Sequence, residues 1–174
     1  MKSSTGVILK IMNVLAWATY FGLAIKIGSI LISYGVSVRN PVAAKNLYMG
    51  MNLSSIYQYD FWQYTAAVMM YVLVLMMEAY TVWLLTKVLG RIKISSPFTT
   101  EIANRLEKIS YVIIATWVVT LITNGHIAWL AKKIPGLPQE MVPGDFLLVA
   151  GIVFVFAQIF KKGVELQSEN ELTV

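Results

Sequence analysis

The chain alternates between long apolar blocks and short polar segments. A membrane-spanning helix needs about 20 residues, because the hydrocarbon core is about 30 Å thick. Four blocks are candidates, at about residues 7–34, 61–88, 109–131 and 141–160. The first three reach this length easily. The fourth is uncharged only from Phe146 to Phe160, so it spans only if Lys161 and Lys162 extend their amines to the headgroups.

These blocks are predicted to be helices rather than strands. The run from Val68 to Met77 does not alternate between apolar and polar residues, as a membrane barrel strand does. Backbone groups in lipid must pair within their own segment, which a helix achieves. The predicted fold class is all-α, an integral membrane four-helix bundle in a single domain. Its helices cover about residues 7–34, 61–88, 99–131 and 141–162, followed by a tail over 163–174.

The composition supports a membrane protein. Of 174 residues, 57% are apolar and only 13% are charged, whereas soluble domains contain roughly 25% charged residues. The net charge of +5 comes from basic residues beside the apolar blocks, where they contact lipid headgroups, so we expect no direct nucleic-acid binding. The apolar stretch after Lys2 lacks a convincing cleavage site, which predicts a retained helix and not a signal peptide.

The sequence offers little for catalysis. Cysteine is absent, which excludes disulfides and cysteine-ligated metals. The motifs of serine hydrolases, P-loop proteins and zinc proteases are missing as well. The single histidine, His126, cannot build a histidine-rich metal site; we expect an interfacial hydrogen-bonding residue, with pH sensing as the alternative. We therefore expect neither an enzyme nor a cofactor.

The basic residues predict the orientation in the membrane. With the N-terminus inside, nine lysines and arginines lie on the inner side and four on the outer side, and Lys26 lies within the first helix. The positive-inside rule then predicts that both termini are cytoplasmic. We expect the protein to be located in the plasma membrane, with several spans. Trp62 and Trp129 fall at the outer interface, where aromatic side chains commonly anchor helices.

The cytoplasmic segment before the third span carries clear signals for the start of a helix. Thr99 can accept a hydrogen bond from a free backbone N–H, Pro97 keeps the preceding chain out of a helix, and Phe98 is placed as a staple residue. Glu101 suits the first turn and reaches Arg105 four residues later. An amphipathic helix therefore begins here, with an apolar face at Ile102, Leu106, Ile109 and Ile113.

This amphipathic start has two interpretations. It is either a helix start on the membrane surface or a docking face for a cytoplasmic partner, since amphipathic helices serve both purposes. The tail is either a frayed helix end or a peptide that packs against residues 97–109 or a partner. The candidate docking residues are Pro97, Phe98, Thr99, Glu101, Asn104, Arg105, Leu106, Glu169, Asn170 and Leu172.

A second group of candidates consists of polar residues inside the predicted spans. Glu78 lies near the middle of the bilayer, where a carboxyl is costly unless it is protonated, paired or hydrated. It is either a site that responds to protons or a ligand, or a neutral carboxyl bonded to a neighbouring helix. Asn13 and Gln158 complete this candidate polar site, although such residues often serve as interhelical contacts. Lys26 is expected more than about 10 Å from Glu78 in depth, with its amine extended to the outer headgroups.

Two short motifs resemble a known family. Ser96-Pro97-Phe98-Thr99, followed by Glu101, Asn104, Leu106 and Ile109, resembles the "PFT-E-N-L-I" segment of the bacterial DUF2975 membrane proteins. The tail from Gly163 to Val174 is similar to that family's ending, with Glu171 where aspartate is common. The resemblance covers nearly the whole chain in length and span layout. It implies a small four-span bacterial membrane protein without an established activity. Relatives are often encoded beside a small Cro-like helix-turn-helix regulator, which implies a regulatory partnership.

Two functions are consistent with these features. The first is a regulatory or scaffolding membrane protein whose cytoplasmic face, from Arg91 to Lys108 together with the tail, docks a soluble partner such as a helix-turn-helix regulator. The alternative is a small transporter or channel in which Glu78 faces a polar path. Four helices line a pore only as an oligomer or around a very narrow path. Small residues of the first span, including Gly22 and Gly28, permit the close packing of a homo-oligomer.

Overall fold

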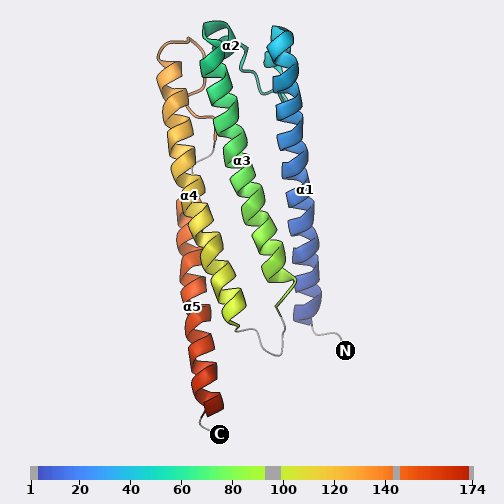
Figure 1. The fold of residues 1–174 in the computed structure, drawn as a ribbon, viewed down its shortest axis with the longest axis vertical. Coiled ribbons are helices and arrows are strands. Elements are labelled where there is room, and N and C mark those ends of the chain that lie inside the picture. Colours follow the sequence, from blue (N-terminus) through green and yellow to red (C-terminus); the bar gives the residue numbers. More distant parts are fainter. Residues whose placement is uncertain (1–3, 93–98, 143–145, 173–174) are drawn as a thin grey trace. The chain divides into compact units, whose positions relative to one another are not determined.

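The chain is all-helical, as its sequence predicts. The computed structural model describes residues 4–92, 99–142 and 146–172, and within these ranges it contains no strand (Figure 1). The elements in chain order are α1 (Ser4–Arg39), the 3₁₀ helix η1 (Pro41–Lys45), α2 (Ser54–Tyr59), α3 (Phe61–Leu89), α4 (Thr100–Ala131) and α5 (Phe146–Leu172).

Three helices are long and apolar enough to cross a membrane. They are Gly6–Arg39 in α1, Phe61–Leu89 in α3 and Thr100–Ala131 in α4, with 34, 29 and 32 residues. At a rise of about 1.5 Å per residue, each exceeds a hydrocarbon core of about 30 Å. Among the described residues, α5 does not meet the same criteria of length and composition. The finding supports a membrane protein with three apolar spans and leaves the fourth predicted span as a proposal.

The helix limits follow the sequence pattern closely for α3 and α4 but less closely for α1 and α5. α1 continues past residue 34 to Arg39 and stops before Pro41. The proline disfavours a helical conformation at Asn40, whose φ and ψ are −129° and 98°. α5 begins at Phe146 rather than at about residue 141, and it continues beyond residue 162 to Leu172. The segment predicted as a tail is therefore largely helical.

The chain forms two compact units. The loop unit comprises Phe21–Glu78 and Thr116–Gly144. The terminal unit comprises Met1–Tyr20, Ala79–Ala115 and Asp145–Val174. α1, α3 and α4 each contribute to both units, whereas η1 and α2 belong to the loop unit and α5 to the terminal unit.

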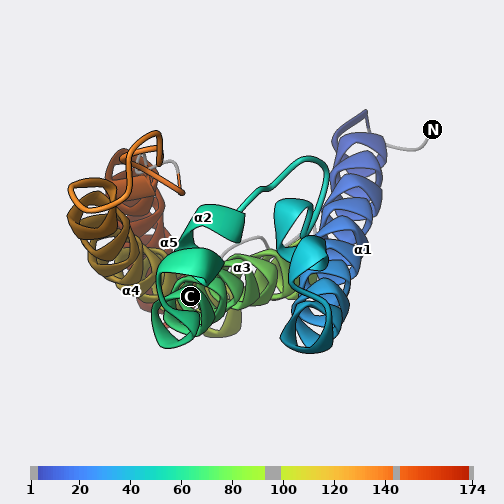
Figure 2. The same ribbon diagram turned by 90° about the horizontal axis from the view of Figure 1, so that it is seen from above.

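In the loop unit, the connection between α1 and α3 is part of the folded core. Ala44 of η1 and Ile56 of α2 are buried in a cluster that also contains Ile30 of α1, Tyr64 of α3 and Leu130 of α4. Figure 2 shows η1 at the end of α1 and α2 at the start of α3. The burial of apolar side chains from this connection removes them from water and fixes its path.

Two hydrogen bonds join α1 and α3 in the loop unit. The hydroxyls of Ser37 and Tyr64 lie 2.8 Å apart, and both residues are buried. The hydroxyls of Tyr34 and Thr65 lie 3.1 Å apart. A buried hydroxyl is costly without a partner, so these two pairs favour one register between the helices.

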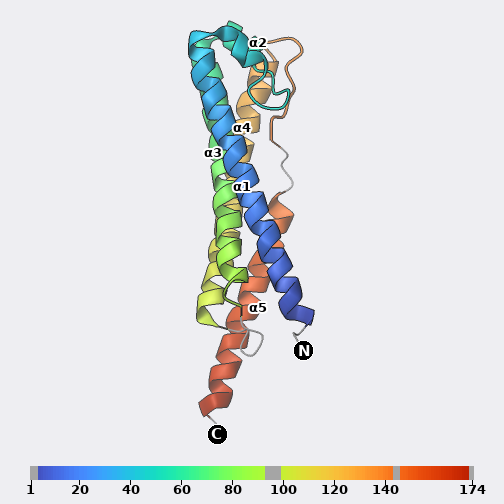
Figure 3. The same cartoon turned by 90° about the vertical axis from the view of Figure 1, so that its right-hand side faces the viewer.

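One side chain holds the connection that follows α4. Asn124 Nδ2 donates to the backbone oxygen of Val142 at 2.7 Å, and Asn124 Oδ1 accepts from the backbone N–H groups of Met141 and Val142, both at 3.1 Å. Ile134 of the same connection joins the core of the loop unit. Figure 3 shows this connection beside the segment that contains η1 and α2. The bonds explain why Met141 and Val142 do not begin the last helix.

The terminal unit has its own apolar core, shared by three helices. It contains Leu84 and Val88 of α3, Ile102, Ile109 and Ile113 of α4, and the half-buried Val153 and Phe160 of α5. The rings of Tyr111 and Phe154 lie 6.3 Å apart between their centroids. α5 therefore lies beside the first half of α4, as Figure 1 also shows.

Replacing Asn124 by alanine is expected to destabilise the loop unit. The substitution removes three hydrogen bonds to Met141 and Val142 and should cost about 2 kcal/mol. The free energy of unfolding in detergent micelles measures this effect. The control is Asn104→Ala at an exposed position of the same helix, which should change stability by less than about 0.5 kcal/mol. Equal stability of Asn124→Ala and the wild type would contradict this role for Asn124.

Candidate functional site

The start of α4 is capped as the sequence predicts. The backbone N–H of Ile102 donates to Thr99 Oγ1 at 3.3 Å, and the N–H of Ala103 donates to the backbone oxygen of Thr99 at 3.0 Å. This cap fixes where α4 begins, so the residues that follow hold defined positions on its surface. Pro97 and Phe98, which belong to the predicted docking segment, lie outside the described residues.

Glu101 links the end of α3 to the start of α4. Its carboxylate accepts a hydrogen bond of 2.9 Å from Arg105 and forms an ion pair with Arg91, which follows α3. The first contact is the i,i+4 pair expected from the sequence, and the second is new. The hydrogen bond from Arg105, with help from the charge of Arg91, holds the pKa of Glu101 below its usual value. These pairs are therefore present at neutral pH and are lost as the pH falls through the lowered pKa.

The predicted apolar face of α4 is present, and it packs against α3 and α5 in the core of the terminal unit. Ile102 and Ile109 are buried, and Leu106 packs against their cluster together with side chains of α3 and α5. In the terminal unit this face is covered by neighbouring helices, so it neither lies on a membrane surface nor stays open to a partner. Leu106 is thus a packing residue. The exposed residues at the start of α4 are polar and include Glu101 and Asn104.

An ion pair between α4 and α5 joins residues far apart in the sequence. Lys161 Nζ lies 2.8 Å from both Oε1 and Oε2 of Glu107, which is 54 positions earlier. The two side chains are 37% and 22% exposed, so the pair is partly shielded from solvent. Sequence spacing gives no signal for this contact. Lys162 differs from Lys161 because it pairs within α5, with Glu165.

The docking candidates of the tail lie in the last turns of α5. The helix continues through Glu169 and Asn170 to Leu172, so this segment is not an unwound peptide. Glu169 is exposed. The side chains of Asn170 and Leu172 lie outside those that the structure describes. Their roles in docking stay predictions.

Glu78 is half-buried on α3, in the loop unit. The Lys26 ammonium of α1 lies over the ring of Tyr71, 5.3 Å from the ring centroid. Tyr71 precedes Glu78 by seven residues, or about 10 Å along a helix. The lysine amine is therefore displaced from Glu78 toward the start of α3, in the direction that the sequence predicts.

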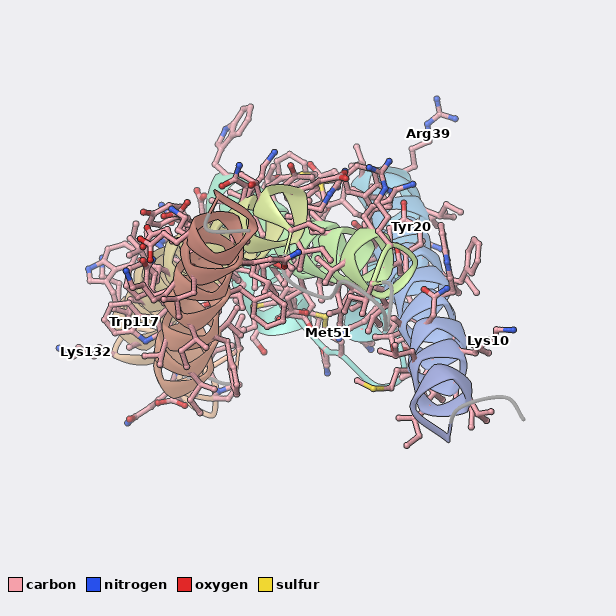
Figure 4. All side chains as sticks on the ribbon, turned by 90° about the horizontal axis from the view of Figure 1, so that it is seen from below. Lys10, Tyr20, Arg39, Met51, Trp117 and Lys132 are labelled. Atoms are coloured by element: carbon pink, nitrogen blue, oxygen red, sulfur yellow. The ribbon has the colours of Figure 1, made fainter. Side chains whose placement is uncertain are left out.

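Asn13 and Gln158 belong to the terminal unit, whereas Glu78 belongs to the loop unit. Asn13 borders a pocket of about 570 Å³ with Lys10 of α1 and Gly90 after α3. Its Oδ1 atom is buried and has no hydrogen-bond partner among the described residues. Figure 4 shows that the Lys10 side chain points away from α3. Gln158 is exposed on α5, which does not fit a buried interhelical contact.

His126 lies on α4 in the loop unit, stacked on Trp129 with 5.9 Å between the ring centroids. Its Nε2 atom is buried and finds no hydrogen-bond partner within the described ranges. The expected interfacial hydrogen bond is therefore not made by this atom. Across residues 4–92, 99–142 and 146–172, no group of three or more histidine, cysteine, aspartate or glutamate side chains is arranged to hold a metal ion.

Comparison with known proteins assigns a family. The family model described as "Protein of unknown function (DUF2975)" matches residues 48–174, which include α2 to α5. The chain belongs to the DUF2975 family. The resemblance seen in the two sequence motifs, both of which lie inside the match, is thereby confirmed. The match begins at residue 48 and leaves α1 outside, whereas the resemblance was expected to cover nearly the whole chain. No curated protein and no solved structure matches the chain. Membership in DUF2975 gives no activity, so a function must be argued from the residues themselves.

The Glu107–Lys161 pair predicts a measurable coupling between α4 and α5 in this DUF2975 protein. A double-mutant cycle with Glu107→Gln and Lys161→Gln should give a coupling free energy of about 1 kcal/mol, because the pair is partly shielded. Unfolding in micelles is the measurement. The matched control is the cycle for Lys162 and Glu165, which are 64% and 60% exposed, and it should give no measurable coupling because solvent screens this pair. Couplings of equal size would show that the pair does not hold α5.

Proposed function

We propose that this DUF2975 protein is a regulatory or scaffolding protein of the bacterial plasma membrane, with four spans and both termini in the cytoplasm. The polar surface where α3 ends and α4 begins would dock a soluble partner, such as a helix-turn-helix regulator. The observation that carries this proposal is the ion-paired start of α4, where Glu101 engages Arg91 and Arg105 outside the apolar part of the helix.

The length of α4 supports a segment beyond the membrane. Its 32 residues extend about 48 Å, whereas the hydrocarbon core is about 30 Å thick. The part from Ile109 to Ala131 is long enough to cross and contains no acidic residue, lysine or arginine. The residues before Ile109, including Glu101 and Asn104, are therefore available to lie among the headgroups or beyond them.

Contacts within the terminal unit support a common side for both termini. Lys10 and Gly90 border the same pocket, so the start of α1 lies near the end of α3. Lys161 bonds Glu107, so the later part of α5 lies near the start of α4. α3 and α4 are consecutive spans joined at this end. The excess of basic residues in these segments favours the cytoplasmic side.

The proposed docking surface consists of Arg91, Glu101, Asn104 and Arg105. Arg91 and Glu101 are 55% and 48% exposed, so a partner can reach them. Their ion pair restricts the side chains before binding, which lowers the entropy lost on association. Arginine is enriched in protein interfaces, and its planar group matches carboxylates. A soluble protein with an acidic patch therefore fits this surface. The helix-turn-helix regulator implied by the family resemblance is the candidate for this partner.

Transport or conduction is a second candidate function, favoured by the polar groups of the loop unit. Glu78 is half-buried on a helix that can span a membrane, and the Lys26 ammonium lies over Tyr71 rather than against this carboxyl. Acids within membrane helices often mark proton or ion paths. Buried hydroxyls occur on the neighbouring α4, at Thr116, Thr120 and Thr123.

Charge reversal at Arg91 tests the docking surface. The partner to test is a helix-turn-helix protein encoded beside this gene. Arg91→Glu should weaken its binding by at least about tenfold, because the new carboxylate repels an acidic patch and breaks the pair with Glu101. Binding is measured with the purified membrane protein in detergent. Arg39→Glu, an exposed change in the loop unit, is the control and should bind normally. Full affinity in Arg91→Glu, with normal unfolding behaviour, counts against this surface.

Glu78→Gln tests the second function. If Glu78 carries protons or ions, wild-type protein in liposomes should show a flux under an imposed gradient, and the neutral variant should lose at least about nine-tenths of it. A pH-sensitive dye inside the liposomes measures proton flux. Glu140→Gln, at an exposed position of the loop unit, should keep the full rate. Wild-type protein without any flux would remove this function.

A further inference from the structure

Two lysines and two stacked aromatic rings form a row on α3 and α4 in the terminal unit. The rings of Tyr80 and Trp83 are stacked, with centroids 5.8 Å apart and an angle of 18° between their planes. Lys87 Nζ lies over the Trp83 ring, 5.2 Å from its centroid. Lys108 Nζ of α4 lies over the Tyr80 ring of α3 at 5.5 Å. We call these four residues the cation–aromatic ladder.

The two lysines of the ladder have no acidic partner among the described residues. Within the part of the chain that the structure describes, neither Lys87 nor Lys108 forms an ion pair, whereas Arg91 and Arg105 share the carboxylate of Glu101. The aromatic faces attract the ammonium groups and orient them, but they carry no net charge. An anion can therefore bind here without displacing an internal partner.

The position of the ladder fits the headgroup region of a membrane. Lys108 directly precedes the apolar part of α4, and Lys87 lies in the last turn of α3. Tryptophan and tyrosine favour this depth because their rings are amphipathic. Tyr80 is 37% exposed and Lys108 is exposed, so lipid can reach them.

We propose that the cation–aromatic ladder binds anionic phospholipids in the cytoplasmic leaflet, with one phosphate at each end of the row. The ammonium groups of Lys87 and Lys108 lie over different rings, and each binds the phosphate of its own headgroup. The rings of Tyr80 and Trp83 restrict the lysine side chains and border the headgroups. Basic sites between membrane helices select anionic headgroups in this way. A zwitterionic lipid offers a similar phosphate, but its own cation is repelled by the two lysines. The site therefore discriminates by the net charge of the headgroup.

The test offers the detergent-purified protein equal amounts of phosphatidylglycerol and phosphatidylcholine with the same acyl chains. Native mass spectrometry measures the lipid retained. The wild type should retain phosphatidylglycerol about tenfold more than phosphatidylcholine. Lys87→Gln with Lys108→Gln should lose this preference, whereas Lys87→Arg with Lys108→Arg should keep it. If the double glutamine variant does not fold, the single variants Lys87→Gln and Lys108→Gln serve instead, and each should show a reduced preference.

A matched control removes two lysines elsewhere. Lys45→Gln with Lys132→Gln changes two exposed residues of the loop unit and should leave the preference unchanged; the outward position of Lys132 is visible in Figure 4. Equal retention of the two lipids by the wild type would overturn the proposal, and so would a preference that survives the glutamine variants. Millimolar inorganic phosphate separates the two sources of phosphate. If it displaces phosphatidylglycerol completely, the site binds free phosphate and not lipid; persistence of the lipid supports the proposal.

Discussion

The buried face of α4 organises both units. Backbone groups of a membrane helix bond within that helix, so side-chain contacts decide how its neighbours pack. From Ile109 to Leu130, buried positions recur along α4 every three or four residues, which is the spacing of a helix face. In the terminal unit this face presents Ile102 and Ile109 to α3 and α5, and in the loop unit it presents Ile127 and Leu130 to the core that contains the connection before α3. The same face therefore cannot serve as an open docking surface.

The sequence predicts a helix end correctly where nearby residues determine it. The start of α4 was predictable because Thr99 caps it, and the end of α1 is explained by Pro41. The start of α5 was not predictable. Met141 and Val142 look like part of an apolar span, but Asn124 binds their backbone N–H groups from 17 and 18 positions away. Hydrophobic periodicity carries no information about such a tertiary contact.

The candidate site shows the same division between local and distant contacts. The Glu101–Arg105 pair follows from i,i+4 spacing, so the sequence predicted it. The apolar face that includes Leu106 was also predicted. Its packing against α3 and α5 was not, because periodicity identifies an apolar face but not the helices that cover it. The Glu107–Lys161 pair depends on α5 lying beside α4, and nothing in the spacing of the two residues indicates that.

The basic residues near the α3–α4 connection divide according to their partners. Arg91 and Arg105 share Glu101, and their planar groups suit directional bonds to protein carboxylates. Lys87 and Lys108 lie over aromatic rings and pair with no acid in the part of the chain that the structure describes, and their compact charges suit phosphate. Arg105 and Lys108 are three residues apart on α4, which is within the distance of about 8 Å over which charges interact at physiological salt. A lipid bound at the lysines would therefore change the potential at the proposed docking surface, and headgroup composition would then alter partner affinity without any movement of the helices.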